Sequence, residues 1–250
     1  MVKVAAYQAP LLPAGSTELA LRLIRERVEW CEAEGVDILC CPEGVLGGLA
    51  DYASLPEAFA IDAGSGQLDA VLALLASDRV TTIVGFTECT SEGRLYNSAA
   101  VFHRGSVAGV YRKLHPAINT SVYTAGDLMP VFTAGDLTFG IAICRDSTFP
   151  EPTRQMAAQG AAVLFVPSNN GLPPVKGGPE LVADARSCDR ARAVENRMWV
   201  VRADVAGRTG GLVSHGSSAI VDPQGTVVAE ARMLETGLVV GEIQSASRAR

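Results

Sequence analysis

The chain has 250 residues, of which 48% are hydrophobic and 19% charged, and its formal net charge is −6. This is the composition of an ordinary globular protein with enough apolar material for a large core. The negative charge, without any Lys/Arg cluster, argues against nucleic acid or an anionic membrane as a partner, and the chain lacks the run of about 18 apolar residues that predicts a membrane span.

The first part of the chain alternates predicted strands with predicted helices. A helix is expected over residues 15–34, because apolar side chains recur there at helical spacing while charged ones fall on the other face. Strands are expected at 2–8, 36–43 and 80–88, and a second helix at 66–77. The strand at 36–43 is apolar almost throughout, a pattern typical of a strand that is buried on both faces.

The remainder of the chain mixes hairpins with further helices. The expected elements are hairpins at 94–115 and 130–144, helices at 151–160 and 179–197, and strands at 161–169, 198–207, 217–230 and 237–244. Because no repeat, low-complexity tract or linker interrupts the pattern, a single domain over residues 1–250 is predicted. Strand–helix–strand units combined with hairpins indicate an α/β fold of mixed sheets with helices on their outer faces.

The cysteines and histidines indicate the cellular compartment and bear on whether a metal is bound. Six cysteines are spread over the chain and form no C-x-x-C pair, so we expect reduced thiols in a cytoplasmic protein. The three histidines have no metal-ligand spacing, so neither a metal nor another cofactor is expected.

Three functional groups lie at the end of runs that are predicted to be buried: Glu43, Lys113 and Cys144. A charge near a core is costly unless it is paired. Together the three groups make chemical sense, because a free thiol with a pKa of about 8.5 is mostly protonated at neutral pH. A carboxylate can accept that proton, and an ammonium can favour the thiolate and stabilise an oxyanion.

Each of these groups also has a plainer interpretation. Cys144 can be a buried structural thiol, as Cys40 and Cys41 are expected to be. Glu43 can be a cap on a helix or turn, and Lys113 can be a surface lysine on an exposed hairpin. Spacing alone does not bring the three groups together in space.

Three motifs favour the catalytic interpretation. The segments CPEGVLGG around Glu43, GVYRKLHP around Lys113 and AICRDSTFPEPTR around Cys144 resemble, in order and separation, those of the nitrilase or carbon–nitrogen hydrolase superfamily. VKVAAYQAP, NSAAVF, RARAVENRMWVVRADVAG and SHGSSAIVDPQGTVVAE are similar to other segments of that family. The resemblance covers nearly the whole chain, residues 2–243.

The resemblance implies a four-layer α-β-β-α sandwich of two mixed sheets, which pairs with a second copy through helices as a homodimer or assembles as a higher homo-oligomer. By analogy, Glu43 is the general base, Cys144 the nucleophile and Lys113 the oxyanion stabiliser, joined by the backbone N–H of Arg145. The implied reaction is hydrolysis of a non-peptide carbon–nitrogen bond through a cysteine thioester.

The chain departs from the family pattern at one position. Many amidase-type members carry a second glutamate after the lysine, whereas KLHPAINTSVYTAGD has no acid between Lys113 and Asp127 and places Asn119 nearest to that position. An asparagine can orient the lysine or the substrate by hydrogen bonding, but it cannot share a proton.

The sequence indicates the reaction class more sharply than the substrate. The candidate substrate-binding residues are Asn119, Tyr123, Arg145, Asn169 and Asn170. The Arg145 guanidinium either holds a substrate carboxylate or makes an ion pair with an acid such as Asp146.

Because ICRDSTFPE resembles amidase-like members, a small amide or N-carbamoyl compound is favoured as the substrate over a nitrile. Two further alternatives stay open: an inactive binding or scaffold member of the same fold, and a redox role for the Cys144 thiol.

Overall fold

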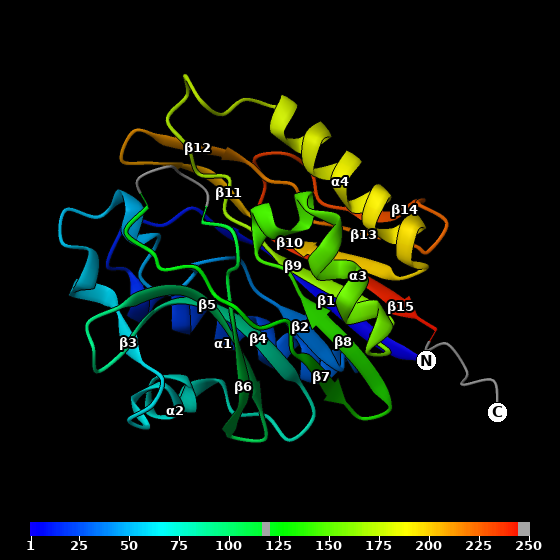
Figure 1. The fold of residues 1–250 in the computed structure, drawn as a ribbon, viewed down its shortest axis with the longest axis horizontal. Helices are drawn as coiled ribbons and strands as arrows, with labels where there is room; N and C mark the ends of the chain where they lie inside the picture. The colour runs from blue at the N-terminus through cyan, green and yellow to red at the C-terminus, as the bar shows by residue number, and fades with distance from the viewer. Residues whose placement is uncertain (117–120, 245–250) are drawn as a thin grey trace.

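The computed structural model describes residues 1–116 and 121–244 and contains two mixed β-sheets with helices on their outer sides (Figure 1). The α/β sandwich expected from the sequence is therefore confirmed. None of the described helices is both long enough and apolar enough to cross a membrane.

The first sheet has the order β12-β11-β1-β2-β4-β5-β6, with β15 also paired to β1 and β3 also paired to β4. Strands β1, β2 and β4 are parallel, whereas β4, β5 and β6 are antiparallel neighbours. The bounds are β1 Val2–Pro10, β2 Ile38–Cys40, β3 Ile61–Asp62, β4 Thr81–Cys89, β5 Leu95–His103, β6 Ser106–Arg112, β11 Val205–Thr209, β12 Leu212–His215 and β15 Gly237–Ile243.

The second sheet has the order β14-β13-β10-β9-β8-β7, and its central strands β8, β9 and β10 are parallel. The bounds are β7 Val131–Ala134, β8 Leu137–Ile141, β9 Val163–Pro167, β10 Trp199–Ala203, β13 Ala219–Val221 and β14 Val227–Glu230. The helices α3 and α4 lie over this sheet in Figure 1.

Alternation along the strands builds two cores. In β2, Ile38 and Cys40 join the core between the sheets, while Leu39 joins the core under the outer helices α1 and α2. Because successive side chains of a strand point to opposite faces, a central strand of a sandwich must be apolar at every position. The burial on both faces that was predicted for this segment is confirmed.

The helices are α1 Thr17–Glu34, α2 Gln67–Leu72, α3 Pro150–Ala158 and α4 Glu180–Asn196, with short 3-10 turns η1 Ala50–Tyr52, η2 Pro56–Phe59, η3 Ala73–Leu75 and η4 Cys144–Thr148. The helix expected over 66–77 is thus a short α-helix that tightens into η3. Leu72 and Leu75 are both fully buried, and a 3-10 turn places residues three apart on the same side.

The site lies where strands of both sheets end. Glu43 follows β2 and Lys113 follows β6 in the first sheet, while Cys144 follows β8 and Asn169 follows β9 in the second. The carboxyl ends of parallel strands meet at one edge of a sheet, where α/β proteins bind their ligands. Both sheets bring these edges to the same end of the sandwich, since a backbone hydrogen bond joins Glu43 to Ser168.

Candidate active site

A buried carboxylate–ammonium pair occupies the centre of this edge. The Lys113 Nζ lies 2.6 Å from Glu43 Oε1, and the side chains are 3% and 2% exposed. The same oxygen accepts a hydrogen bond from Asn97 Nδ2 at 2.7 Å, and Oε2 accepts one from the Asn169 backbone N–H at 3.0 Å. Glu43 is therefore held by one residue from each of three segments that are distant in the chain.

Local sequence explains why the chain turns inward at Glu43. Pro42 has no N–H to extend the ladder, and Gly44 adopts a left-handed conformation with φ 55°. The loop then passes directly over β4 at Gly85, where a Cβ would lie 2.3 Å from the Pro42 carbonyl oxygen and 2.8 Å from the Glu43 Cα. A side chain at position 85 would push the carboxylate out of place.

The charge on Lys113 survives its burial. Burial disfavours the ammonium, but the neighbouring acidic groups, Glu43 foremost, together outweigh that cost, and the pKa of Lys113 stands above its ordinary value. The amine is therefore a fixed positive charge at neutral pH, as an oxyanion stabiliser must be.

Cys144 is the first residue of η4 and takes an unusual backbone conformation. Its φ is 47°, in the left-handed region that non-glycine residues seldom adopt, and its side chain is only partly buried. The Sγ lies 3.9 Å from Asn170 Oδ1. A strained turn at the end of β8 presents the sulfur instead of enclosing it among the apolar side chains before it.

The pKa of Cys144 is raised to about 12, first by burial and then by the negative charge of Glu43, while Lys113 and Arg202 act to lower it. The ammonium thus acts in the expected direction, but burial and the carboxylate outweigh it. The thiol is protonated at neutral pH, so a nucleophilic role would require a base to take its proton.

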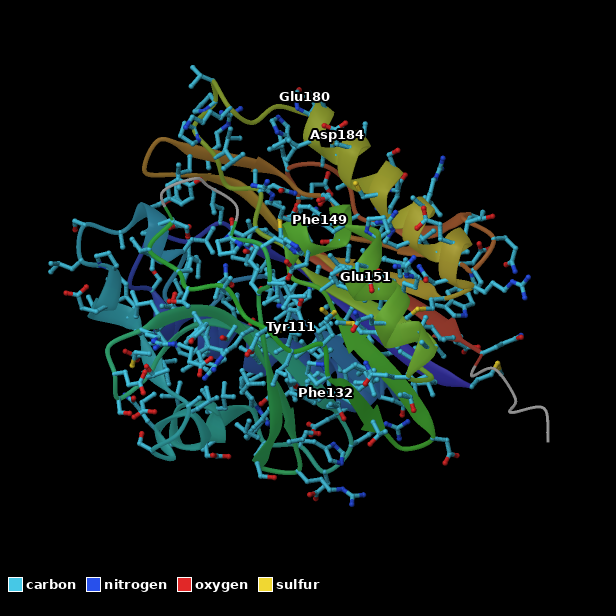
Figure 2. The ribbon with its side chains drawn as sticks, viewed as in Figure 1. Tyr111, Phe132, Phe149, Glu151, Glu180 and Asp184 are labelled. Carbon is cyan, nitrogen blue, oxygen red and sulfur yellow. The ribbon has the colours of Figure 1, made fainter. Side chains whose placement is uncertain are left out.

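Asp146, which the sequence pattern did not single out as a site residue, ties the lysine segment to the cysteine turn. Its fully buried carboxylate accepts hydrogen bonds from the Tyr111 hydroxyl at 2.7 Å, from the backbone N–H of Leu114 and His115 at 3.2 and 2.8 Å, and from Ile143 N–H at 3.3 Å. The His115 Nδ1 lies 3.0 Å from it, and the His115 ring stacks on Phe149. Figure 2 labels Tyr111 and Phe149.

Replacing Asp146 with asparagine is expected to lower the free energy of unfolding by about 3 kcal/mol, because an amide cannot accept from all of these donors and leaves some of them buried without partners. Urea unfolding measures the change. Asp136→Asn, at the exposed β7–β8 turn, is the matched control and should shift the free energy by less than about 0.5 kcal/mol. Equal effects of the two substitutions would contradict the assignment.

A buried ion pair supports the cysteine turn from the other side. Arg202 donates to Asp189 at 2.8 and 2.5 Å and to Ser147 Oγ at 3.0 Å, and the Ser147 hydroxyl donates to the Cys144 carbonyl oxygen at 2.8 Å. Burial disfavours the Arg202 charge, but Asp189 and the other acidic groups nearby together outweigh that cost, and the pKa of Arg202 stands above its ordinary value. Arg202 in the otherwise apolar strand β10 is the sequence signal that could have revealed this pair, whereas Asp189 lies in the highly charged helix α4.

The predicted substrate-binding residues have different surroundings. The Tyr123 hydroxyl accepts a hydrogen bond from the Ala50 N–H at 2.7 Å and lies 2.8 Å from Thr87 Oγ1. Its hydrogen bonds are therefore made within the protein. The exposed Arg145 lies 6.0 Å from the centre of the Phe149 ring. Asn119 lies outside the described residues.

Asn169 and Asn170, in contrast, contact two of the three proposed catalytic groups directly. Asn169 donates to Glu43, and Asn170 contacts the Cys144 sulfur. The Asn170 amide is oriented by Asp204, to which its Nδ2 donates at 2.8 Å. Within residues 1–116 and 121–244, no group of three or more His, Cys, Asp or Glu side chains is arranged to hold a metal ion.

Two cavities lie at this end of the sandwich. The larger, of about 360 Å³, is lined by Asn169 and Tyr52 among mainly apolar residues. The smaller, of about 190 Å³, is lined by Cys144 and Arg145, and also by Cys188 of α4. A second thiol thus lies at the same small cavity as the proposed nucleophile.

The two mixed sheets and the buried Glu43–Lys113 pair are those of a nitrilase-superfamily hydrolase. Residues 3–250 match the carbon–nitrogen hydrolase family, and the chain belongs to that family. The resemblance inferred from the sequence motifs is confirmed.

Three similar proteins show the range of the family. A nitrilase of Pyrococcus abyssi is 32% identical over 250 residues, covering 97% of this chain and 90% of the relative. An (R)-stereoselective amidase of a Pseudomonas species is 31% identical over 229 residues, covering 90% of this chain and 80% of the relative. A solved variant of the Nesterenkonia sp. AN1 amidase, showing the result of Michael addition of acrylamide at its active-site cysteine, has a TM-score of 0.81 at 25% identity, covering 98% of this chain and 94% of that one.

Proposed function

We propose that this protein hydrolyses the carbon–nitrogen bond of a small amide or N-carbamoyl compound through a thioester on Cys144. The observation that carries the proposal is the Glu43–Lys113 pair, 2.6 Å apart and buried, whose charges both act on the Cys144 thiol. Folding alone does not call for a buried ion pair beside a strand-end sulfur, because apolar residues of similar size are at least as stable there.

The first half of the reaction forms the thioester. The Cys144 sulfur attacks the carbonyl carbon while its proton passes to the Glu43 carboxylate, which matches a thiol whose raised pKa keeps it protonated until attack. The Lys113 ammonium and the Arg145 backbone N–H stabilise the oxyanion. The protonated Glu43 then gives its proton to the departing nitrogen, and ammonia or an amine leaves.

The second half returns the enzyme to its starting state. Glu43 takes a proton from water as the water oxygen attacks the thioester carbon. The carbon–sulfur bond breaks, the acid leaves, and the proton on Glu43 returns to the sulfur. One water molecule is consumed, and each group ends with the charge it had at the start.

An amide is favoured over a nitrile by two similarities. The segment after the nucleophile resembles amidase-like members, and the amidases among the similar proteins include one with a matching fold over nearly the whole chain. A nitrile-hydrolysing activity is the second candidate, because a nitrilase is equally similar in sequence.

Mass spectrometry of the intact protein tests the proposal. After brief exposure to hexanamide, N-carbamoylglycine or hexanenitrile, we expect an acyl or carbamoyl adduct on the Cys144 peptide and release of ammonia, with the amide giving the greatest yield. Acrylamide, which adds to the active-site cysteine of the Nesterenkonia amidase, serves as a probe of thiol access.

The other outcomes identify the alternatives. An inactive scaffold member releases no ammonia from any of the three compounds, and a redox protein consumes peroxide with turnover. A nitrilase forms its adduct from the nitrile alone. Ammonia release with no adduct on Cys144, even when the second half is slowed by low temperature, would assign the nucleophile elsewhere.

A further inference from the structure

The larger cavity at the carboxyl edge is built almost entirely from apolar side chains. Four leucines from three separate segments line it: Leu11 and Leu12 after β1, Leu49 before η1, and Leu212 at the start of β12. Its volume of about 360 Å³ falls within the range of small-molecule pockets, about 300–1,000 Å³.

Two residues connect this cavity to the reacting groups. Asn169 lines the cavity, and its backbone N–H donates to Glu43 Oε2 at 3.0 Å. Tyr52 also lines it, and the pKa of its hydroxyl is raised first by burial and then by the carboxylates of Asp51 and Glu43. Asn170, the next residue along the chain, has its Oδ1 3.9 Å from the Cys144 sulfur, so the cavity reaches the segment that contacts both the proposed base and the proposed nucleophile.

The two cavities differ in the charge of the side chains that line them. None of the described residues that line the larger one is an Asp, Glu, Lys, Arg or His. The smaller cavity, in contrast, is lined by Arg145, Asp184 and Arg202 next to Cys144. A charged group placed among the leucines would lose its hydration without gaining a partner, whereas an alkyl or aryl group gains by leaving water.

We propose that the acyl group of the substrate is uncharged and apolar and binds in the leucine-lined cavity, with Tyr52 and Asn169 at its catalytic end. This inference rests on the proposed amide hydrolysis, and it makes Leu49 and Leu212 determinants of specificity. A substrate with a carboxylate at the far end of its acyl chain is disfavoured, even though Arg145 lies close to the nucleophile.

A series of amides tests the inference. From acetamide through butanamide to hexanamide, kcat/KM is expected to rise about fourfold per added methylene until the cavity is filled, the ratio for burying one CH₂ group. Succinamate, which places a carboxylate at the end of a four-carbon acyl chain, is expected to be at least 100-fold poorer than butanamide. Equal or better use of succinamate would overturn the inference and leave amide hydrolysis standing.

Substitutions assign the effect to the cavity. Leu212→Lys is expected to lower the hexanamide-to-acetamide ratio of kcat/KM at least tenfold and to improve succinamate relative to butanamide. Leu128→Lys is the matched control, since Leu128 is 70% exposed and does not line this cavity, and it should leave both ratios unchanged. If Leu212→Lys does not fold, Leu49→Asn is the second variant, and it is likewise expected to lower the hexanamide-to-acetamide ratio of kcat/KM.

A binding measurement separates the two proposals. Thermal unfolding of the Cys144→Ala variant with hexanamide or succinamate reports occupancy without turnover. Stabilisation by hexanamide but not by succinamate supports the apolar acyl site. If the unsubstituted protein hydrolyses no amide, the proposed function is rejected, but the apolar acyl site is not. Stabilisation by succinamate at the same concentration as hexanamide, or by neither compound, rejects the apolar acyl site.

Discussion

Replacing Cys144 with alanine is expected to reduce amide hydrolysis to background, a loss on the order of 10⁶-fold, which is what removal of a nucleophile costs in a well-studied hydrolase. The fold is expected to persist, because the change removes only the sulfur at a partly buried position and leaves a small cavity. Ammonia release and the thermal unfolding midpoint measure the two effects on one preparation.

Cys188→Ala is the matched control. Cys188 lines the same small cavity as Cys144 and is also partly buried, but it lies on α4 and has no part in the proposed chemistry. Its removal should leave turnover intact. If hydrolysis persists in Cys144→Ala, the assigned nucleophile is wrong. If both variants lose hydrolysis, both thiols are needed for turnover.

Much of the fold could be predicted because the sandwich imposes simple periodicities. A run that is apolar at every position, such as residues 38–41, indicates a strand covered on both faces, and β2 is such a strand. The prediction of one strand over 198–207 is wrong, because the chain changes sheet at Asp204, with β10 before it in the second sheet and β11 after it in the first. Two short strands, β3 and β12, were not predicted. β3 has two residues, and β12 follows β11 through the turn at Gly210 and Gly211, so neither has a pattern long enough to detect.

The candidate site could be predicted only where a residue interrupts an apolar run. Glu43, Lys113 and Cys144 do so, and the structure brings the first two into contact. Asn97 and Asp146 could not be assigned in this way, since the hydrogen bond from Asn97 to Glu43 spans 54 positions and that from Tyr111 to Asp146 spans 35. Such contacts are set by the packing of two sheets, which no local pattern specifies.

Substrate contacts and the association of subunits are likewise not specified by local sequence patterns. Tyr123 follows the motif that would place it at the substrate, yet its hydroxyl is bonded to Ala50 and Thr87. The leucines of the larger cavity come from three segments and carry no motif at all. The homodimer and the cytoplasmic location stay predictions, because they concern contacts and surroundings outside a single chain.

The second large effect is expected from Glu43→Gln, which should lower kcat on the order of 10³-fold, within the usual contribution of a general base. Glutamine has nearly the same shape and keeps an oxygen that can accept from Lys113 and Asn97, so the site is expected to keep its geometry. Glu88→Gln is the matched control, because Glu88 is also a buried carboxylate but pairs with Arg112, and its turnover should stay within about threefold of the parent.

The reactivity of the Cys144 thiol toward an alkylating agent should increase in Glu43→Gln, although hydrolysis decreases. The Glu43 carboxylate raises the pKa of Cys144, and the Lys113 ammonium lowers it. The carboxylate has the larger effect of the two, so removing its negative charge must lower the thiol pKa from about 12, and more thiolate is then present at neutral pH. Alkylation of Cys144 by iodoacetamide at pH 7.5 should become faster in the variant while hydrolysis becomes slower. A base acting only through the shape of the site would slow both reactions, and a turnover loss below about tenfold would place the base on another residue.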